Sequence, residues 1–328
     1  MNELETSLAY RPTEEDIAAV RSLPADRLPV VSVVVPSFNQ ADFISQTLES
    51  IFSQNYPRIE VFVSDGGSTD GTIDILEDHQ KRHGDKFRYI SAPDGGQHHA
   101  VNNGIRNTTG EVIAWINSDD VYCEDTFWKV VTAFHFNRCA MVFYGRNKYV
   151  DRDLNPVVDY PVDWSPVLRA QKTRMMHRCL PPQPSLFFRR VACTLSGLLT
   201  SEIVDYELWL RWQQDIPFYF MDECLSYSRL HGEAKTVRDS QMLIRGICDV
   251  VHSYYRTVPR SWTQTLAYHE RYGSVWTKGG DPPPITSQVR VKGYLYWAYF
   301  NLRWAPRAIR QSLAEYRLWF RESLHGRV

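Results

Sequence analysis

The sequence predicts an α/β fold in which a mostly parallel sheet is covered on both faces by helices. Short runs rich in β-branched residues alternate with stretches of helical periodicity from residue 30 to residue 137. The first run, VVSVVVP, is apolar throughout, as is typical of a strand buried on both faces. Each run ends in a polar cluster. Because strands that alternate with helices run parallel, these clusters should meet at one edge of the sheet, where α/β proteins bind ligands.

The elements are expected in a regular order. The first strand stops at Pro36, and the next helix places Phe43, Ile44, Leu48 and Ile51 on one side. Strands are expected at residues 30–36, 59–64, 87–91 and 111–116, and helices at 42–54, 71–82, 97–107 and 124–137. Further along, we expect a short strand at the end of 179–190, an amphipathic helix at 203–212 and a strand-like segment that ends at His231.

The chain is expected to have three parts. Residues 1–29 are an appended arm in which Thr13 caps a short helix, and residues 30–240 are the main domain. Residues 241–328 are a helical, aromatic-rich extension. Within it the segment DPPPITSQ, residues 281–288, cannot be helical and marks a linker.

Composition excludes several classes of protein. The net charge of −1 gives no reason to expect nucleic acid as a partner. The six cysteines contain no CxxC pair, so they indicate reduced thiols in a cytoplasmic protein rather than a disulfide framework or a zinc site. The polar, acidic N-terminus is not a secretory signal, and no run of about 18 apolar residues is present to span a bilayer.

The stretch AWINSDD places two adjacent carboxylates, Asp119 and Asp120, at the end of an apolar strand. Like charges side by side repel, and each is costly to remove from water unless a cation is near. Hard oxygen ligands in a cleft suit Mg²⁺ or Mn²⁺. Zinc is disfavoured because no Cys or His cluster surrounds the pair.

Other polar loops indicate a nucleotide. In SDGGSTDGT, Asp65 offers a carboxylate to the N–H of a uracil-like base, and the two glycines after it let backbone approach a ligand. Asp70 is expected to cap the next helix. Asp94 precedes a helix that begins near Gln97, where free amides favour negative charge. The alternative is that these residues only make turns, which explains one loop better than several.

The ordered set VSVVVPSFNQADFISQTLESIFSQNYPRIEVFVSDGGSTDGT, DGGQHHAVNNGI and GEVIAWINSDD resembles the family 2 glycosyltransferases of GT-A fold. The resemblance covers roughly residues 30–235. It implies a GT-A type, Rossmann-like sheet, a nucleotide-diphosphate sugar donor and inversion of the anomeric centre. The family's base-binding acid falls on Asp65. Its metal-binding D-x-D falls on Asn117, Ser118 and Asp119, so the first acid is replaced here and Asp119 is left as the metal ligand.

The resemblance and the loops together predict a donor site and a metal site. Donor contacts are expected at Pro36, Phe38, Asn39, Asp65, Asp94, Gln97, Asn117, Ser118 and Gln183. Ligands of Mn²⁺ or Mg²⁺ are expected at Asp119, Asp120 and His231. Arg229 and Lys235 either meet phosphate or are simply solvated.

The catalytic base of the family falls on Asp205, at the start of the helix in IVDYELWLRW. Read without the resemblance, a carboxylate at a helix start only caps the helix. The usual neighbour of this base is Glu, and Val204 replaces it here. Glu207 is the competing acid, but helical geometry favours a surface pair with Arg211.

The C-terminal tail carries a different signal. After Pro306, helical spacing places Ile309, Leu313, Tyr316 and Phe320 on one face and Arg307, Arg310, Arg317 and Arg321 on another. A basic amphipathic helix with aromatic residues indicates peripheral contact with an anionic membrane and favours a lipid-linked acceptor. The alternatives are packing on the catalytic domain or on a second subunit of a homo-oligomer.

The sequence therefore predicts a metal-dependent, inverting glycosyltransferase of the cytoplasm or the inner face of the membrane. A sugar would move from a UDP-sugar or a related donor to a hydroxyl of a saccharide or lipid-linked acceptor, in surface polysaccharide assembly. A sugar nucleotidyltransferase is disfavoured because VVVPSFNQ lacks the Gly-rich, Arg-containing loop of that class. The remaining alternative is a non-catalytic nucleotide-sugar-binding or membrane-associated assembly protein. Donor sugar, acceptor and linkage cannot be read from the sequence.

Overall fold

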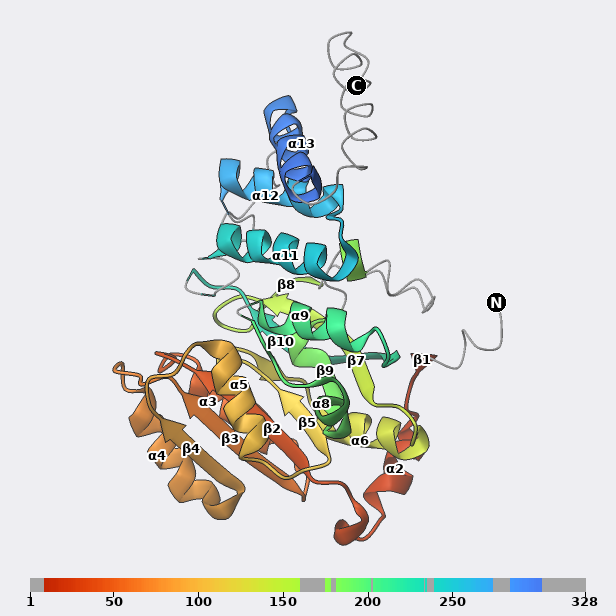
Figure 1. The fold of residues 1–328 in the computed structure, drawn as a ribbon. Coiled ribbons are helices and arrows are strands. Elements are labelled where there is room, and N and C mark those ends of the chain that lie inside the picture. The colour runs from red at the N-terminus through yellow and green to blue at the C-terminus, as the bar shows by residue number, and fades with distance from the viewer. Residues whose placement is uncertain are drawn as a thin grey trace. The chain divides into compact units, whose positions relative to one another are not determined.

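The computed structural model describes residues 9–159, 175–177, 181–201, 203–232, 234, 239–273 and 284–302. The chain forms two compact units (Figure 1). One comprises Met1–Met175 and Cys179–His231, and the other comprises Met176–Arg178 and Gly232–Val328. Every predicted donor, metal and catalytic residue belongs to the first unit.

The first unit is built on a ten-stranded sheet with the order β1-β10-β7-β9-β5-β2-β3-β4. Its parallel part is β5 (Val112–Trp115), β2 (Val31–Ser37), β3 (Ile59–Asp65) and β4 (Phe87–Ser91). β9 (Leu186–Arg189) runs antiparallel to β5 and β7, and beyond it lie β7 (Val142–Val150), β10 (Phe218–Arg229) and β1 (Ala9–Tyr10). β6 (Val121–Tyr122) pairs with β10, and β8 (Pro156–Asp159) pairs with β7. The α/β class with a mostly parallel sheet is confirmed.

Helices cover both faces of this sheet. The predicted helices appear as α3 (Ile44–Phe52), α4 (Thr72–His83), α5 (Gln97–Arg106), α6 (Thr126–Phe136) and α9 (Val204–Trp212), with α8 (Val191–Ser196) in addition. Alternate residues of β2 face opposite ways: Val33 packs in the core with α3 and α6, whereas Val34 meets α5 at Gly104. An added Cβ on Gly104 would lie 2.3 Å from Val34 Cγ1, so glycine allows α5 to lie directly on the sheet.

The N-terminal residues are part of the same packing. Thr13 caps α2 (Glu14–Arg21) in a reciprocal capping box with Asp16, as the sequence predicts. Ile17 and Val20 of α2 are buried in the core that contains α6. β1 adds a short parallel strand beside β10, a pairing that the sequence did not predict.

The second unit is helical in its described part, as predicted. Its helices are α11 (Ser240–Tyr255), α12 (Arg260–Tyr272) and α13 (Ser287–Leu302). Ile244, Leu266 and Phe300 form its core, and Asn301 bonds both N–H and C=O of Val258. α13 begins at Ser287, so the predicted non-helical segment 281–288 was too long by two residues. The tail predicted at 306–324 lies outside the described residues. Among the described helices, none is long and apolar enough to cross a membrane.

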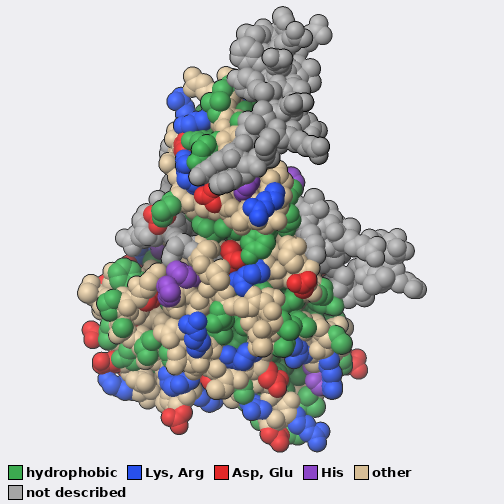
Figure 2. Space-filling view, viewed as in Figure 1, with side chains coloured by type: hydrophobic (Ala, Val, Ile, Leu, Met, Phe, Trp, Pro, Cys, Tyr) green, Lys and Arg blue, Asp and Glu red, His purple; other side chains and the backbone are tan. Residues whose placement is uncertain are grey.

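Charge is mixed on the visible surface of the first unit. Lysine and arginine are interspersed with aspartate and glutamate over the face in Figure 2. That face therefore presents no broad field of one sign, in line with the net charge of −1.

Candidate functional site

The predicted polar loops meet at the carboxyl-terminal edge of the parallel strands. β5, β2, β3 and β4 are neighbours that run in one direction, so their carboxyl ends lie side by side (Figure 1). Pro36 is buried inside β2, one residue before the strand ends. The loops that follow these strands carry most of the predicted donor contacts, at the edge where parallel sheets bind ligands.

The loop after β2 is tied to the loop after β3 by Asn39. Its backbone is left-handed, with φ of 52°. Its N–H donates to Ser68 Oγ at 2.7 Å, and its side-chain Oδ1 accepts the N–H of Thr69 at 2.9 Å. Phe38, next to it, keeps 59% of its surface exposed. Asn39 thus fixes the loop, and Phe38 presents an aromatic ring at its tip.

Asp65 is the most constrained acid of the site, with 1% of its surface exposed. Its Oδ1 accepts the amides of Gly67 and Ser68 at 3.0 and 2.8 Å and the hydroxyl of Ser91 at 2.7 Å. Its Oδ2 accepts the Ser68 hydroxyl. The carboxylate predicted to contact a base therefore shapes the β3 loop and ties it to the end of β4.

Three loops come into contact around Gly66. A Cβ added there would lie 3.3 Å from Phe38 Cδ2 and 3.5 Å from Asp94 Oδ1. Asp94 in turn accepts the N–H of Gly96 at 2.9 Å, just before α5. A side chain at Gly66 would crowd the Phe38 ring and touch Asp94, so the glycine allows the three loops to converge closely.

Asp70 braces the start of α4 rather than occupying its cap position. The cap position is held by Gly71 at φ 96°, and Asp70 accepts the N–H of Thr72 at 3.1 Å and of Ala41 at 3.0 Å. Burial raises the pKa of Asp70, but the hydrogen bonds from Thr72 and Ala41 outweigh it, so the pKa lies below its usual value. Asp70 thus caps α4 as predicted, but only through the N–H of Thr72, the first residue of the helix.

The NSDD turn is held from two sides. Gln97 Nε2, at the start of α5, donates to Asn117 Oδ1 at 2.8 Å. Thr47 Oγ1 lies 2.9 Å from the carbonyl of Ser118 and 2.8 Å from that of Asp120. Asn117, where the resemblance expects an acid, therefore acts as a hydrogen-bonding link. The role of Thr47 in holding this turn was not predicted, although a polar residue on the apolar face of the predicted helix at 42–54 is a sign of a buried hydrogen bond.

The two adjacent carboxylates turn to different partners. Asp119 Oδ2 lies 3.0 Å from His231 Nε2. Asp120 is 5% exposed, and its Oδ1 accepts the N–H of Arg229 at 3.0 Å. Burial, and then the charge of Asp119, raises the pKa of Asp120 well above its usual value. Asp119 and His231 are thus brought together as predicted, whereas Asp120 is directed to the backbone of β10. No cluster of at least three His, Cys, Asp or Glu suited to a metal occurs within the part of the chain that the structure describes.

An aromatic and cationic cluster packs against the Asp119–His231 pair. Arg229 is 3% exposed, lies 4.7 Å from the ring centroid of Phe43 and donates to Gln46 Oε1 at 2.7 Å. The same Phe43 ring lies 4.5 Å from the ring of His231 and 5.0 Å from Arg152 Cζ. Burial lowers the pKa of Arg229, and the charges of Asp119 and Asp120 oppose that effect. The sequence predicts Phe43 only as a residue of a helix face, so this contact with Arg229 and His231 was not predicted.

Gln183 and the acids of α9 complete the set of predicted residues. Gln183 is buried, and its Nε2 donates to the carbonyl of Trp115 at 2.6 Å, at the end of β5. Asp205 is half-buried in the first turn of α9, where its Oδ1 accepts the N–H of Tyr206 at 2.8 Å. Glu207 pairs with Arg211 at 3.0 and 3.1 Å. The pair is confirmed, but Glu207 is buried and the predicted surface location was wrong.

The family model named Glycosyl transferase family 2 matches residues 32–186, which contain the polar loops after β2, β3, β4 and β5. This segment is a glycosyltransferase family 2 domain. A chondroitin synthase of Escherichia coli is 28% identical over 232 residues, covering 70% of this chain and 32% of that protein. Two further relatives are described as uncharacterized glycosyltransferases. The chain spans 35% of the length of the one from Rickettsia felis and 66% of the length of the one from Rickettsia prowazekii.

Two solved structures share the fold of this chain. S. aureus TarS 1-349 in complex with UDP-GlcNAc aligns with a TM-score of 0.55 and 19% identity, covering 83% of this chain and 80% of that one. The mannosyltransferase PcManGT from Pyrobaculum calidifontis, in complex with GDP-Man and Mn²⁺, aligns with a TM-score of 0.52 and 18% identity, covering 95% and 83%. These likenesses confirm the predicted GT-A type of sheet.

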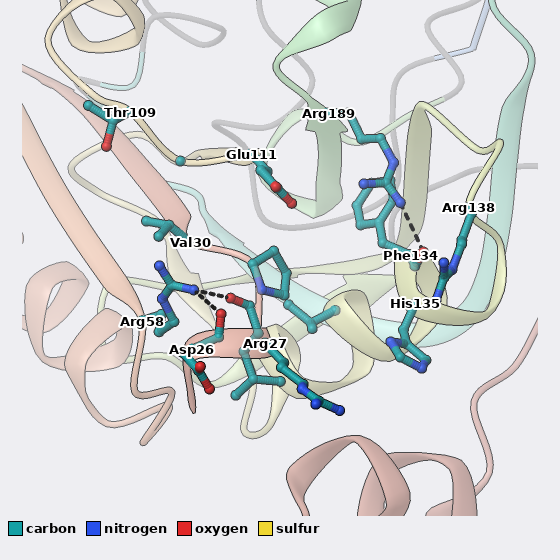
Figure 3. A pocket seen from close by; sticks show the side chains of 14 residues that line it. Asp26, Arg27, Val30, Arg58, Thr109, Glu111, Phe134, His135, Arg138 and Arg189 are labelled. Carbon is teal, nitrogen blue, oxygen red and sulfur yellow. Dashed lines mark hydrogen bonds between the residues drawn. The ribbon is translucent and has the colours of Figure 1, made fainter. Parts of the chain in front are cut away.

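A hollow lies at the opposite, amino-terminal edge of the sheet, away from the loops of the candidate site (Figure 3). Its volume is about 450 Å³, and its lining includes Val30 before β2 and Glu111 before β5. Arg58 Nη1 donates to the carbonyls of Asp26 and Leu28 at 2.9 and 2.7 Å. None of the predicted site residues lines it. Arg189 likewise donates to the carbonyls of Ala140 and Phe134. Arg58 and Arg189 thus hold loops together, so the hollow belongs to the scaffold.

Proposed function

We propose that the chain transfers a sugar from a nucleotide-diphosphate sugar to a hydroxyl of an acceptor saccharide, in polysaccharide assembly. The convergence of the loops that carry Phe38, Asp65, Asp94 and Asp119 at one sheet edge carries this proposal. The likeness to TarS bound to UDP-GlcNAc and to a chondroitin synthase supports a UDP-sugar donor and a saccharide acceptor.

The nucleotide is proposed to lie across the ends of β2, β3 and β4. Phe38 would stack on the base, since its exposed ring stands at the tip of a braced loop. Asp65 Oδ2 would accept a base N–H in place of the Ser68 hydroxyl. The start of α5 would face the diphosphate, where unpaired helix amides favour negative charge.

A divalent cation fits the residues present. Asp119 supplies a carboxylate oxygen and His231 a ring nitrogen, 3.0 Å apart, and Mn²⁺ accepts both donor types. Mg²⁺ and Mn²⁺ commonly use few protein ligands and complete their shell with phosphate oxygens and water. When bound, the ion would offset the negative charge of the departing diphosphate. Asp120 would support the turn through Arg229 rather than bind the ion.

Asp205 is proposed as the base of an inverting transfer. Its carboxylate would take the proton of the acceptor hydroxyl while that oxygen forms a bond to the anomeric carbon and the bond from that carbon to the diphosphate breaks. The hydrogen bond from the Tyr206 amide to Oδ1 fixes the orientation of the carboxylate. The buried Glu207 is engaged by Arg211 and is therefore a poor alternative.

A donor screen tests the proposal directly. Purified protein would be incubated with UDP- and GDP-sugars and Mn²⁺, and nucleotide release would be measured with and without saccharide and lipid-linked acceptors. We expect release from one class of donor that rises when the right acceptor is added. Donor binding by calorimetry with no release under any acceptor would instead support a non-catalytic binding protein.

Membrane contact through residues 306–324 remains a proposal that rests on the sequence. Arginines near an anionic surface contribute about 1 kcal/mol each, which suffices for reversible attachment and favours a lipid-linked acceptor. Truncation should follow Leu302, because α13 buries Phe300 and Asn301 in the second unit. Vesicle sedimentation that is equal for the full and truncated chains would overturn the proposal.

A further inference from the structure

Two half-buried cysteines lie side by side next to the candidate site. Cys123 directly follows β6, Cys224 lies in β10, and their sulfur atoms are 3.6 Å apart. They are separated by 101 positions in the sequence. Both strands lead to the site: Asp120 comes just before β6, and Arg229 ends β10.

An irregularity in β10 accounts for this contact. β6 and β10 are antiparallel with Tyr122 opposite Ser226, and the N–H of Cys123 donates to the carbonyl of Leu225 at 3.0 Å. In a regular ladder, Cys123 and Cys224 would then point to opposite faces. The register of β10 shifts on both sides of Cys224, which is the pattern of a bulge that re-aims a side chain.

The hydrogen bond between the two sulfurs, together with a nearby lysine, favours one reactive sulfur. The hydrogen bond from Cys123 lowers the pKa of Cys224, and Lys148 on the neighbouring β7 acts in the same direction. The same hydrogen bond, together with burial, raises the pKa of Cys123. Because the thiolate is the reactive form, Cys224 is the sulfur expected to react first.

We propose that Cys123 and Cys224 are a reversible oxidation site that forms a disulfide with hydrogen peroxide as oxidant. The Cys224 sulfur attacks one peroxide oxygen, the O–O bond breaks, and water leaves with one thiol proton. The resulting sulfenic acid is attacked by the Cys123 sulfur, and its oxygen leaves as a second water with the remaining proton. Two electrons pass from the thiols to the peroxide. The sulfurs must close from 3.6 Å to about 2.05 Å.

The cross-link would join the two segments that carry the site. It would lie four residues after Asp119 and seven before His231, and the amide of Arg229 that holds Asp120 is on the same strand. Closing the sulfurs would shift these strands against each other, and a displacement near 1 Å in a catalytic arrangement costs up to about 100-fold in rate. We expect about a tenfold loss of sugar transfer on oxidation, reversed by dithiothreitol. This effect on transfer rests on the proposed function, whereas the disulfide itself does not.

Peptide mapping after oxidation tests the site without any donor. The full chain would be treated with hydrogen peroxide, remaining thiols would be alkylated, and digests would be analysed by mass spectrometry. The expected result is a Cys123–Cys224 cross-linked peptide that dithiothreitol removes. Cys123→Ser should lose the cross-link and carry Cys224 on to sulfinic acid, whereas Cys139→Ser, at an exposed cysteine, should keep it.

Two outcomes would overturn the proposal. One is full alkylation of Cys123 and Cys224 under conditions that oxidise Cys139. The other is a cross-link of either cysteine to a different partner. Melting curves of both serine variants would show whether they fold. If the cross-link forms in an active protein and transfer is unchanged, the coupling of this pair to the site is wrong.

Discussion

The two edges of the parallel sheet use polar residues in opposite ways. At the amino-terminal edge, Arg58 and Arg189 donate to backbone carbonyls and hold loops around a hollow of about 450 Å³. At the carboxyl-terminal edge, side chains such as Asn39 and Asp65 brace their own loops, while the Phe38 ring stays exposed and the largely buried Asp119–His231 pair lies beside the braced turns. A hollow alone therefore does not mark the site. The site is marked instead by side chains that do not brace a loop, namely Phe38, Asp119 and His231.

The largest expected effect is a loss of sugar transfer that distinguishes Asp205 from Glu207, two acids of α9. Asp205→Asn should keep donor binding and lose sugar transfer by at least about 100-fold, because the general base is removed. Glu207→Gln is the matched control: it breaks a buried pair with Arg211, so we expect it to lower the melting temperature first. Single-turnover assays and melting curves on both variants would test this. Near-normal transfer by a folded Asp205→Asn protein would move the base elsewhere.

The next effect concerns the cation. Asp119→Asn and His231→Gln should each reduce the Mn²⁺-dependent gain in donor affinity by about tenfold or more, since each removes one of the proposed ligands. Asp125→Asn, at an exposed acid paired with Arg21, should leave the gain intact. Calorimetry with Mn²⁺ and with chelator would measure it. Equal donor affinity under both conditions in the unmodified chain would contradict the metal site.

An exposed ring at each edge gives a third comparison. Phe38→Ala should weaken nucleotide binding by about 1–3 kcal/mol, the range for stacking of a base on an aromatic side chain. Phe136→Ala, at a phenylalanine that is 50% exposed and ends α6 next to His135 of the opposite hollow, should not change binding. Titration with UDP is the measurement. The same affinity in both variants would remove Phe38 from the site.

At the amino-terminal edge we expect stability rather than function to change. Arg189→Met removes donors to the carbonyls of Ala140 and Phe134, and an unsatisfied buried carbonyl costs about 1–3 kcal/mol. Arg138→Met, at an exposed arginine of the same hollow, should change stability by less than about 0.5 kcal/mol. Urea unfolding would measure both. A selective loss of donor binding in Arg189→Met would give this edge a function.

The smallest expected effect is a pH dependence of stability from His79, which belongs to neither edge of the sheet. Burial, and then the charges of Arg82 and His83, lowers the pKa of His79 in α4 from 6.5 to about 4. The unfolded chain therefore takes up this proton at higher pH than the folded chain. Stability should be constant above about pH 6.5 and should fall as the pH drops toward 4. His79→Leu should flatten this part of the melting-temperature profile, and an unchanged profile would contradict the assignment.

The parallel half of the sheet was readable from the sequence because its strands are continuous apolar runs. β3 and β4 were placed to within a residue, and so was the start of α9. β7 was not predicted, and only the end of β10 was, as the strand-like segment that ends at His231, because half-buried strands such as FYFMDECLSYSR mix polar and apolar residues without a clear period. Their pairing joins segments far apart in the chain, and no local pattern encodes it.

The site divides in the same way. Loop residues such as Asn39 and Asp94 were predicted because each follows a recognisable strand. The proximity of Asp119 and His231 was anticipated only through the resemblance, since more than 100 positions separate them. Phe43 and the Cys123–Cys224 contact had no local signal, because both depend on how β10 returns to the sheet.

The short strand β1 has a consequence for handling the protein. It covers β10 at Phe220 and Met221, on the side of that strand away from β7. Without residues 9 and 10, those backbone groups would stand unpaired at the end of the sheet, and an open edge of this kind recruits strands from other molecules. A chain shortened at its N-terminus should therefore self-associate edge to edge, and an affinity tag is better placed ahead of residue 1 than substituted for the first dozen residues.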